Sequence, residues 1–195
     1  HLFLVLLPPV ATAAMRSLVL LTALLATVAQ SLRLSHPGLH FYGKKTVHLK
    51  SGSAASLFYP ALRDGEDTPF DASRAPYPAI TFAPGNLRHL ERYDSLLQHL
   101  ASWGFFVIAP HFGSMNTLPF VEHLSSSLDY FDSQNTHRDS QLFGRIRTDR
   151  YGLAGHSMGA GAGVLLAARD PRIKALTLLE AVDVFPSAIS RLVDV

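Results

Sequence analysis

Residues 151–168 read YGLAGHSMGAGAGVLLAA: a short apolar run, a glycine-rich turn and an apolar run of helical length. Within them, Gly155-His156-Ser157-Met158-Gly159 fits the Gly-x-Ser-x-Gly pattern of a nucleophile elbow. In such an elbow the serine lies on a strained turn between a strand and a helix, and a side chain at either glycine would collide with neighbouring backbone. The pattern therefore predicts a strand over 151–154, a helix over 158–168, and Ser157 as an exposed nucleophile.

Two other interpretations of this segment are possible. A structural turn without a catalytic role is one, and a dinucleotide-binding loop is the other, because Gly161 and Gly163 extend the glycine-rich entry to the helix. A dinucleotide loop follows the first strand of its sheet and is followed, about 20 residues on, by an acidic residue. Here the glycines follow the fifth predicted strand, so we interpret the extra ones as allowing the helix to pack closely on the sheet.

Apolar runs on either side of the elbow predict further strands. Residues 79–83, 105–109 and 175–179 are too short for helices and lack alternation, as expected of strands that are buried on both faces. Residues 90–101 repeat apolar positions every three or four residues and predict a helix that ends near Gly104. A strand, a helix and a second strand in this order form a right-handed crossover in a parallel sheet.

Weaker patterns complete the prediction. Residues 41–49 and 55–59 indicate a hairpin. Residues 60–78 contain four prolines and a glycine and predict a loop, and residues 118–131 predict a helix. Because strands and helices alternate along the chain, the expected fold class is α/β, a three-layer sandwich with a mostly parallel sheet.

Composition limits the function classes. The chain has 195 residues, 48% hydrophobic and 16% charged, which suits one folded domain and excludes a disordered or fibrous chain. Residues 1–63 hold six basic and no acidic side chains, whereas the remainder holds eleven basic and fifteen acidic ones, a net charge of −4. Without a dense basic stripe, nucleic-acid binding is not expected. The absence of cysteine excludes disulfides, thiolate metal sites and a cysteine nucleophile, and we expect no metal or cofactor.

The N-terminal segment resembles a secretory leader. The chain begins with His1, and Met15 is the only plausible start, so residues 1–14 are interpreted as upstream translation. Residues 15–29 give the order of a signal peptide, with a basic residue, an apolar run and a small residue, and cleavage is expected after Ala29 or Ser31. The eleven-residue apolar run is shorter than the roughly 20 residues that cross a bilayer, so a signal anchor is the less favoured alternative. We expect a secreted protein with no membrane span after cleavage and a folded domain over 30–195.

An elbow serine also needs donors for the oxyanion that forms when it attacks a carbonyl. In this type of fold one donor is the N–H of the residue after the nucleophile, which is Met158 here, and the second comes from the loop after an earlier strand. Pro84-Gly85-Asn86 follows the strand predicted at 79–83, so the N–H of Asn86 is the expected second donor. The alternative for Pro84-Gly85 is an ordinary turn.

Two segments carry a family resemblance. YPAITFAPG (77–85) and LLQHLASWGFFVIAP (96–110) resemble the α/β-hydrolases that include chlorophyllases, platelet-activating factor acetylhydrolases and cutinase-like polyester hydrolases. The resemblance covers about half the chain. The second segment is most similar to chlorophyllases, but Met158 is typical of polyester hydrolases, where chlorophyllases carry arginine. The resemblance implies a serine carboxylesterase that cleaves a small-molecule lipophilic ester, chlorophyllase-like or lipase-like, through an acyl-enzyme.

The resemblance also implies where the other catalytic groups lie. The triad order is serine, acid, histidine, but all ten histidines precede Ser157, so the catalytic histidine is expected beyond Val195. The domain is then C-terminally truncated and inactive as this fragment. The acetylhydrolase pattern favours Glu180 as the acid and the chlorophyllase pattern favours Asp183, which we prefer. Polyester hydrolases place it one strand later, and either acid is alternatively a helix cap or a solvated loop residue.

A function of a different class remains open. The chain is alternatively a hydrolase-like binding protein that has lost catalysis and holds a lipid or pigment in its apolar cleft.

Overall fold

A computed structural model describes residues 34–85, 89–111, 117–184 and 187–194. Apart from residues 1–37, the chain from residue 38 to residue 195 forms one compact unit. The predicted signal peptide at 15–29 and the upstream residues 1–14 lie outside the described residues, as does Asn86. Among the described residues, no helix combines the length and apolar character that crossing a membrane requires.

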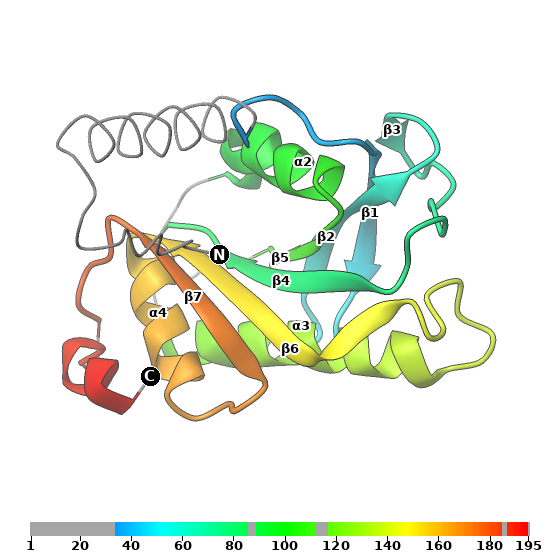
Figure 1. The fold of residues 1–195 in the computed structure, drawn as a ribbon. Coiled ribbons are helices and arrows are strands. Elements are labelled where there is room, and N and C mark those ends of the chain that lie inside the picture. Colours follow the sequence, from blue (N-terminus) through cyan, green and yellow to red (C-terminus); the bar gives the residue numbers. More distant parts are fainter. Residues whose placement is uncertain (1–33, 86–88, 112–116, 185–186, 195) are drawn as a thin grey trace, which may run out of the picture. The chain divides into compact units, whose positions relative to one another are not determined.

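A seven-stranded sheet in the order β3-β1-β2-β5-β4-β6-β7 forms the centre of unit 38–195 (Figure 1). Its strands are β1 Phe41–His48, β2 Ala54–Ala61, β3 Gly65–Glu66, β4 Tyr77–Ala83, β5 Phe106–Pro110, β6 Ile146–His156 and β7 Ile173–Leu179. β1 and β2 form the predicted antiparallel hairpin, and β2 pairs antiparallel with β5. β5, β4, β6 and β7 run parallel to one another, as the apolar runs predict.

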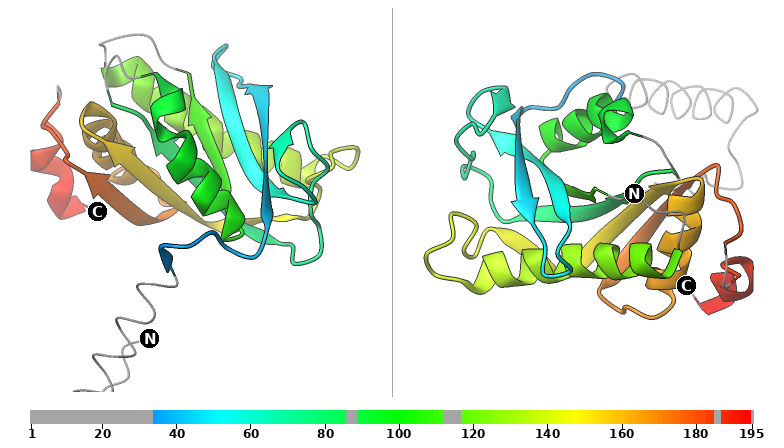
Figure 2. Two further views of the ribbon diagram at one scale, coloured as in Figure 1. Left: turned by 90° about the horizontal axis from the view of Figure 1, so that it is seen from above. Right: turned by 180° about the vertical axis from the view of Figure 1, so that it is seen from behind.

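Helices cover both faces of this sheet. They are α2 Asp94–Ser102, α3 Thr117–Thr136 and α4 Met158–Ala167, with the short 3₁₀ helices η1 Leu90–Tyr93 and η2 Ile189–Asp194. α2 packs on β1, β2 and β5, whereas α3 and α4 pack together on the opposite face (Figures 1 and 2). The three layers and the mostly parallel sheet confirm the predicted α/β-hydrolase class.

Several element boundaries differ from the sequence prediction. The helix predicted over 90–101 begins as η1 and becomes α-helical only at Asp94. The predicted strand 151–154 is the last part of the much longer β6, and the predicted loop 60–78 contains the two-residue β3. β6 runs further than expected because it begins with exposed polar residues, Arg147, Asp149 and Arg150 among them, which mask the strand in the sequence.

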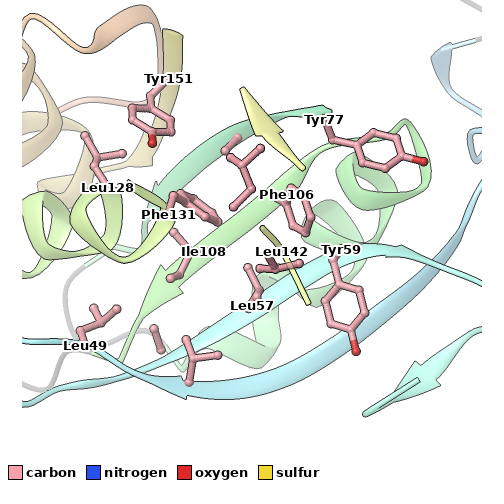
Figure 3. Packing of buried hydrophobic residues seen from close by; sticks show 14 of the residues in the cluster. Leu49, Leu57, Tyr59, Tyr77, Phe106, Ile108, Leu128, Phe131, Leu142 and Tyr151 are labelled. Carbon is pink, nitrogen blue, oxygen red and sulfur yellow. The ribbon is translucent and has the colours of Figure 1, made fainter. Parts of the chain in front are cut away.

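Each face of the sheet has its own apolar core. Figure 3 shows Phe131 among the buried side chains on the α3 side, with Tyr151 and Phe106. The ring of Phe131 stacks on that of Tyr151 with centroids 6.1 Å apart, and its centroid lies 6.1 Å from that of Phe106. On the α2 side, Phe82 and Leu97 are fully buried. Removing such side chains from water is the main contribution that holds helices on a sheet. The two cores therefore fix β4 and β6, the two strands that lead to the elbow region, from both sides.

An ionic cluster joins α3 to the start of β7. The guanidinium of Arg172 lies 2.9 Å from a carboxylate oxygen of Asp129, 2.6 Å from one of Asp132 and 2.7 Å from one of Asp170. The Tyr151 hydroxyl donates to Asp132 at 2.6 Å. This cluster lies before the amino end of β7, away from the elbow, and we interpret it as structural.

Candidate active site

Ser157 occupies the turn between a strand and a helix. β6 ends at His156 and α4 begins at Met158, so the strand, turn and helix occur in the predicted order. Ser157 has φ 54° and ψ −124°, a backbone conformation in which L-residues are rare. Holding a non-glycine residue there costs on the order of 1–3 kcal/mol, which the surrounding structure must offset.

Backbone hydrogen bonds hold this turn in place. The N–H of Ser157 donates to the carbonyl of Leu179 at 2.9 Å, which continues the β6–β7 ladder by one residue. The carbonyl of Ser157 accepts from Gly161 at 3.2 Å and from Val182 at 3.4 Å. Since both polar backbone groups of Ser157 are engaged, the strained conformation is fixed by β7 and α4 together.

The elbow glycines leave no room for a side chain. A Cβ on Gly155 would lie 2.8 Å from the Cα of Ala160, and one on Gly159 would overlap the carbonyl oxygens of Ala83 and Pro84. These contacts bring the first turn of α4 against the end of β4. The backbone needs glycine at both positions, which is the physical reason for the Gly-x-Ser-x-Gly spacing.

The next two glycines serve the same close packing. A Cβ on Gly161 would meet the carbonyl of Val182, and one on Gly163 would overlap the side chain of Leu153. Helix α4 therefore lies nearer to the sheet and to the segment after β7 than a helix with larger side chains can. This agrees with the packing interpretation of the extra glycines and gives no reason to assign them to a dinucleotide.

Met158, one expected oxyanion donor, and the segment Pro84-Gly85 lie at the carboxyl ends of two neighbouring strands. Met158 is the first residue of α4, where backbone N–H groups have no acceptor within the helix. β4 pairs with β6 up to Ala83 opposite Gly155, so Pro84 and Gly85 continue directly beside the elbow. Asn86, the expected second donor, lies outside the described residues.

The neighbouring His156 belongs to a hydrogen-bonded group that the sequence did not reveal. The Nδ1 atom of His156 is 2.9 Å from the hydroxyl of Tyr93, and that hydroxyl accepts from the N–H of Gly85 at 3.0 Å. The sequence pattern presents Tyr93 only as an apolar helix position. No hydrogen bond joins Ser157 Oγ to a histidine within the described ranges, so the general base expected beyond Val195 stays a prediction.

The two candidate acids have different surroundings. The carboxylate of Asp183 accepts from the backbone N–H groups of Val184, Ala188 and Ile189 at 3.0, 2.7 and 3.2 Å. The hydrogen bond from Ile189 is the largest cause that lowers the pKa of Asp183, although burial opposes it. This is the cap arrangement that precedes η2. Glu180, with φ 46°, has a side chain 92% exposed, and its carboxylate lies 3.9 Å from His156 Nε2.

A cleft of about 500 Å³ lies beside Pro84. Polar side chains such as Lys44, Glu91 and His111 line it, together with the apolar Pro84 and Leu90. Pro84 belongs both to this cleft and to the segment whose carbonyl lies against Gly159 of α4. Among the described residues, no three His, Asp or Glu side chains are grouped so that they could hold a metal ion.

Comparison with known proteins gives matches over the same region. The sequence model of a family described as PETase, PET hydrolase-like, matches residues 37–184. Two curated proteins, cutinase est1 and cutinase est2 of Thermobifida alba, are each 34% identical to this chain over 101 residues. That segment covers 51% of this chain and 33% of each cutinase, so the match spans about a third of the length of these relatives.

Proposed function

Because the chain belongs to the PETase, PET hydrolase-like, family, we propose that it contains the nucleophile of a serine carboxylesterase. The observation that carries this proposal is the backbone of Ser157, with φ 54° and ψ −124° on the turn between β6 and α4. A conformation this costly persists where the structure needs it. Here it presents a hydroxyl at the carboxyl edge of a parallel sheet, where ligands of open α/β folds bind.

The proposed reaction follows from the groups around this hydroxyl. Ser157 Oγ attacks the ester carbonyl carbon, and a histidine accepts its proton and returns it to the leaving alcohol. The backbone N–H groups of Met158 and Asn86 donate to the oxyanion of the tetrahedral intermediate. Water then attacks the acyl-enzyme by the same route, which releases the carboxylic acid and restores Ser157.

The proposed base is a histidine beyond Val195. In this fold the histidine follows the nucleophile in chain order, and all ten histidines of this sequence precede Ser157. His156 is the nearest in sequence, but its Nδ1 atom is engaged by Tyr93. We therefore expect turnover from a protein that extends past Val195 and none from residues 1–195 alone.

The acid of the triad is proposed to come one strand after β7. Among the described residues, the chlorophyllase pattern favours Asp183, which is our preferred acid there, and the acetylhydrolase pattern favours Glu180. The three backbone N–H groups that bind Asp183 give its carboxylate a capping role, and Glu180 is almost fully exposed. Membership of a PET hydrolase-like family favours the polyester-hydrolase placement over both.

The proposed substrates are lipophilic carboxylic esters of the polyester or cutin type. The family description and the names of the two cutinases support this class. An insoluble polymer must be hydrolysed outside the cell, so we also propose secretion, for which the signal-peptide pattern at 15–29 is the supporting observation.

The test compares the full-length protein with Ser157→Ala on p-nitrophenyl esters of rising acyl length and on a polyester film. We expect hydrolysis by the unmodified protein and a loss in kcat on the order of 10⁶ in the variant if a full triad is present. Ester binding without turnover in either protein would instead support the hydrolase-like binding protein.

A further inference from the structure

The hydroxyl of Tyr93 connects the segment after β4 with the last residue of β6. The last pair of the β4–β6 ladder is Ala83 opposite Gly155. There the N–H of Gly85 donates to the hydroxyl of Tyr93 at 3.0 Å, and the same hydroxyl lies 2.9 Å from His156 Nδ1. Beyond the last ladder pair, the hydroxyl of Tyr93 thus links Gly85, which precedes Asn86, to His156 of the elbow.

The hydrogen-bond directions in this link follow from its donors. A backbone N–H only donates, so the Tyr93 oxygen accepts from Gly85 and its own proton is free to bind His156 Nδ1. The other ring nitrogen of His156, Nε2, lies 3.9 Å from a carboxylate oxygen of Glu180. The ring of Tyr93 packs on Phe82 with centroids 5.0 Å apart, which orients the hydroxyl.

The three groups are also in close contact. A Cβ added to Gly85 would lie 2.6 Å from His156 Nδ1 and 3.2 Å from the Tyr93 oxygen. On the other side, Gly159 of α4 lies against the carbonyl of Pro84. The segment Pro84-Gly85 is therefore held between α4 and the Tyr93–His156 pair, and no side chain separates them.

We propose that Tyr93 and His156 are positioning residues for ester hydrolysis, a role that rests on the proposed function. They fix Gly85, and through it the start of the loop that carries the second oxyanion donor, relative to Ser157. Donors to an oxyanion stabilise the transition state only when they are held in place before the reaction. A displacement of about 1 Å at such a site costs about a hundredfold in rate.

The test measures kcat and KM of the full-length protein on a soluble p-nitrophenyl ester. Tyr93→Phe removes only the hydroxyl and keeps the ring on Phe82. We expect kcat to fall about tenfold to a hundredfold while KM changes less than about twofold. His156→Leu should do the same, whereas His156→Asn, whose amide oxygen can accept from Tyr93, should keep most of the activity.

A double variant and a matched control separate positioning from stability. Tyr93→Phe with His156→Leu should be no slower than either single variant, because both remove the same link. Tyr151→Phe is the control: it removes a hydroxyl bound to Asp132 at 2.6 Å in the structural cluster. It should lower the melting temperature and leave kcat unchanged.

The outcomes distinguish this inference from the function on which it rests. Turnover that depends on Ser157 but stays at its full rate in Tyr93→Phe would overturn the positioning role and leave the esterase proposal intact. A fall in kcat explained entirely by loss of folded protein, measured from the melting curves of Tyr93→Phe, would also overturn the positioning role. Absence of turnover that depends on Ser157 would overturn the proposed function and the positioning role together.

Discussion

Ser157→Gly separates the backbone strain at the elbow from the chemistry of the hydroxyl. At φ 54° and ψ −124°, a residue with a Cβ costs about 1–3 kcal/mol, and glycine avoids most of that cost. Glycine also makes the unfolded chain freer, which lowers stability by about 0.5–1 kcal/mol. Within the described residues, Ser157 Oγ makes no hydrogen bond that the change would remove. We therefore expect the free energy of unfolding to rise by about 1–2 kcal/mol, while esterase activity disappears.

The matched control for this change is Ser157→Ala. Alanine also removes the hydroxyl, but it keeps the Cβ and hence the strain, so its stability should lie within about 0.5 kcal/mol of the unmodified protein. Thermal unfolding of the three proteins measures the difference, which should appear as a melting temperature about 2–8 °C higher for the glycine variant. A glycine variant no more stable than the alanine variant would refute the strained elbow.

Three further substitutions test the Arg172 ionic cluster, the packing at Gly159 and the role of Asp183. Arg172→Met should lower the free energy of unfolding by about 1–3 kcal/mol at neutral pH, because partly exposed carboxylates lose their shared partner. The hydrogen bond from Arg172 is the largest cause that lowers the pKa of Asp170. The stability that Asp170 gains from Arg172 is therefore present above the unfolded-state pKa near 3.9 and is lost as pH falls through the lower folded-state pKa. In urea unfolding, the difference in unfolding free energy between the unmodified protein and Arg172→Met should be smaller at pH 3 than at pH 7. Gly159→Ala should reduce kcat by at least about a hundredfold, since its Cβ would displace the carbonyl of Ala83, and unchanged kinetics would contradict that packing. Asp183→Ala should lower the melting temperature through loss of the cap yet keep kcat within about tenfold, whereas a loss of about 10⁴-fold would identify Asp183 as the triad acid after all.

The sheet was predictable where both faces of a strand are buried. β4 and β5 consist almost wholly of apolar residues, and their parallel pairing followed from the helical pattern between them. The first half of β6 was not predictable, because Arg147 and Asp149 are exposed and give no apolar alternation. Its pairing with β4 also shifts register between Pro78 and Ala79, which no local pattern indicates.

The same distinction holds at the site. Ser157 was identifiable because the residues that force its turn, Gly155 and Gly159, lie within two positions of it in the sequence. The link from Gly85 through Tyr93 to His156 was not, because it joins residues 8 and then 63 positions apart. The hydrogen bonds from the N–H groups of Ala188 and Ile189 to Asp183 were not predictable either, because they join residues 5 and 6 positions apart across a segment without a regular pattern.

Reaction of the full-length protein with a fluorophosphonate probe tests the nucleophile most directly. A fluorophosphonate modifies only a serine that is activated as in an esterase, so mass spectrometry of the digested protein reports the residue itself. We predict one adduct, on Ser157, and none in Ser157→Ala. An unmodified Ser157 in a protein that still hydrolyses esters would contradict it.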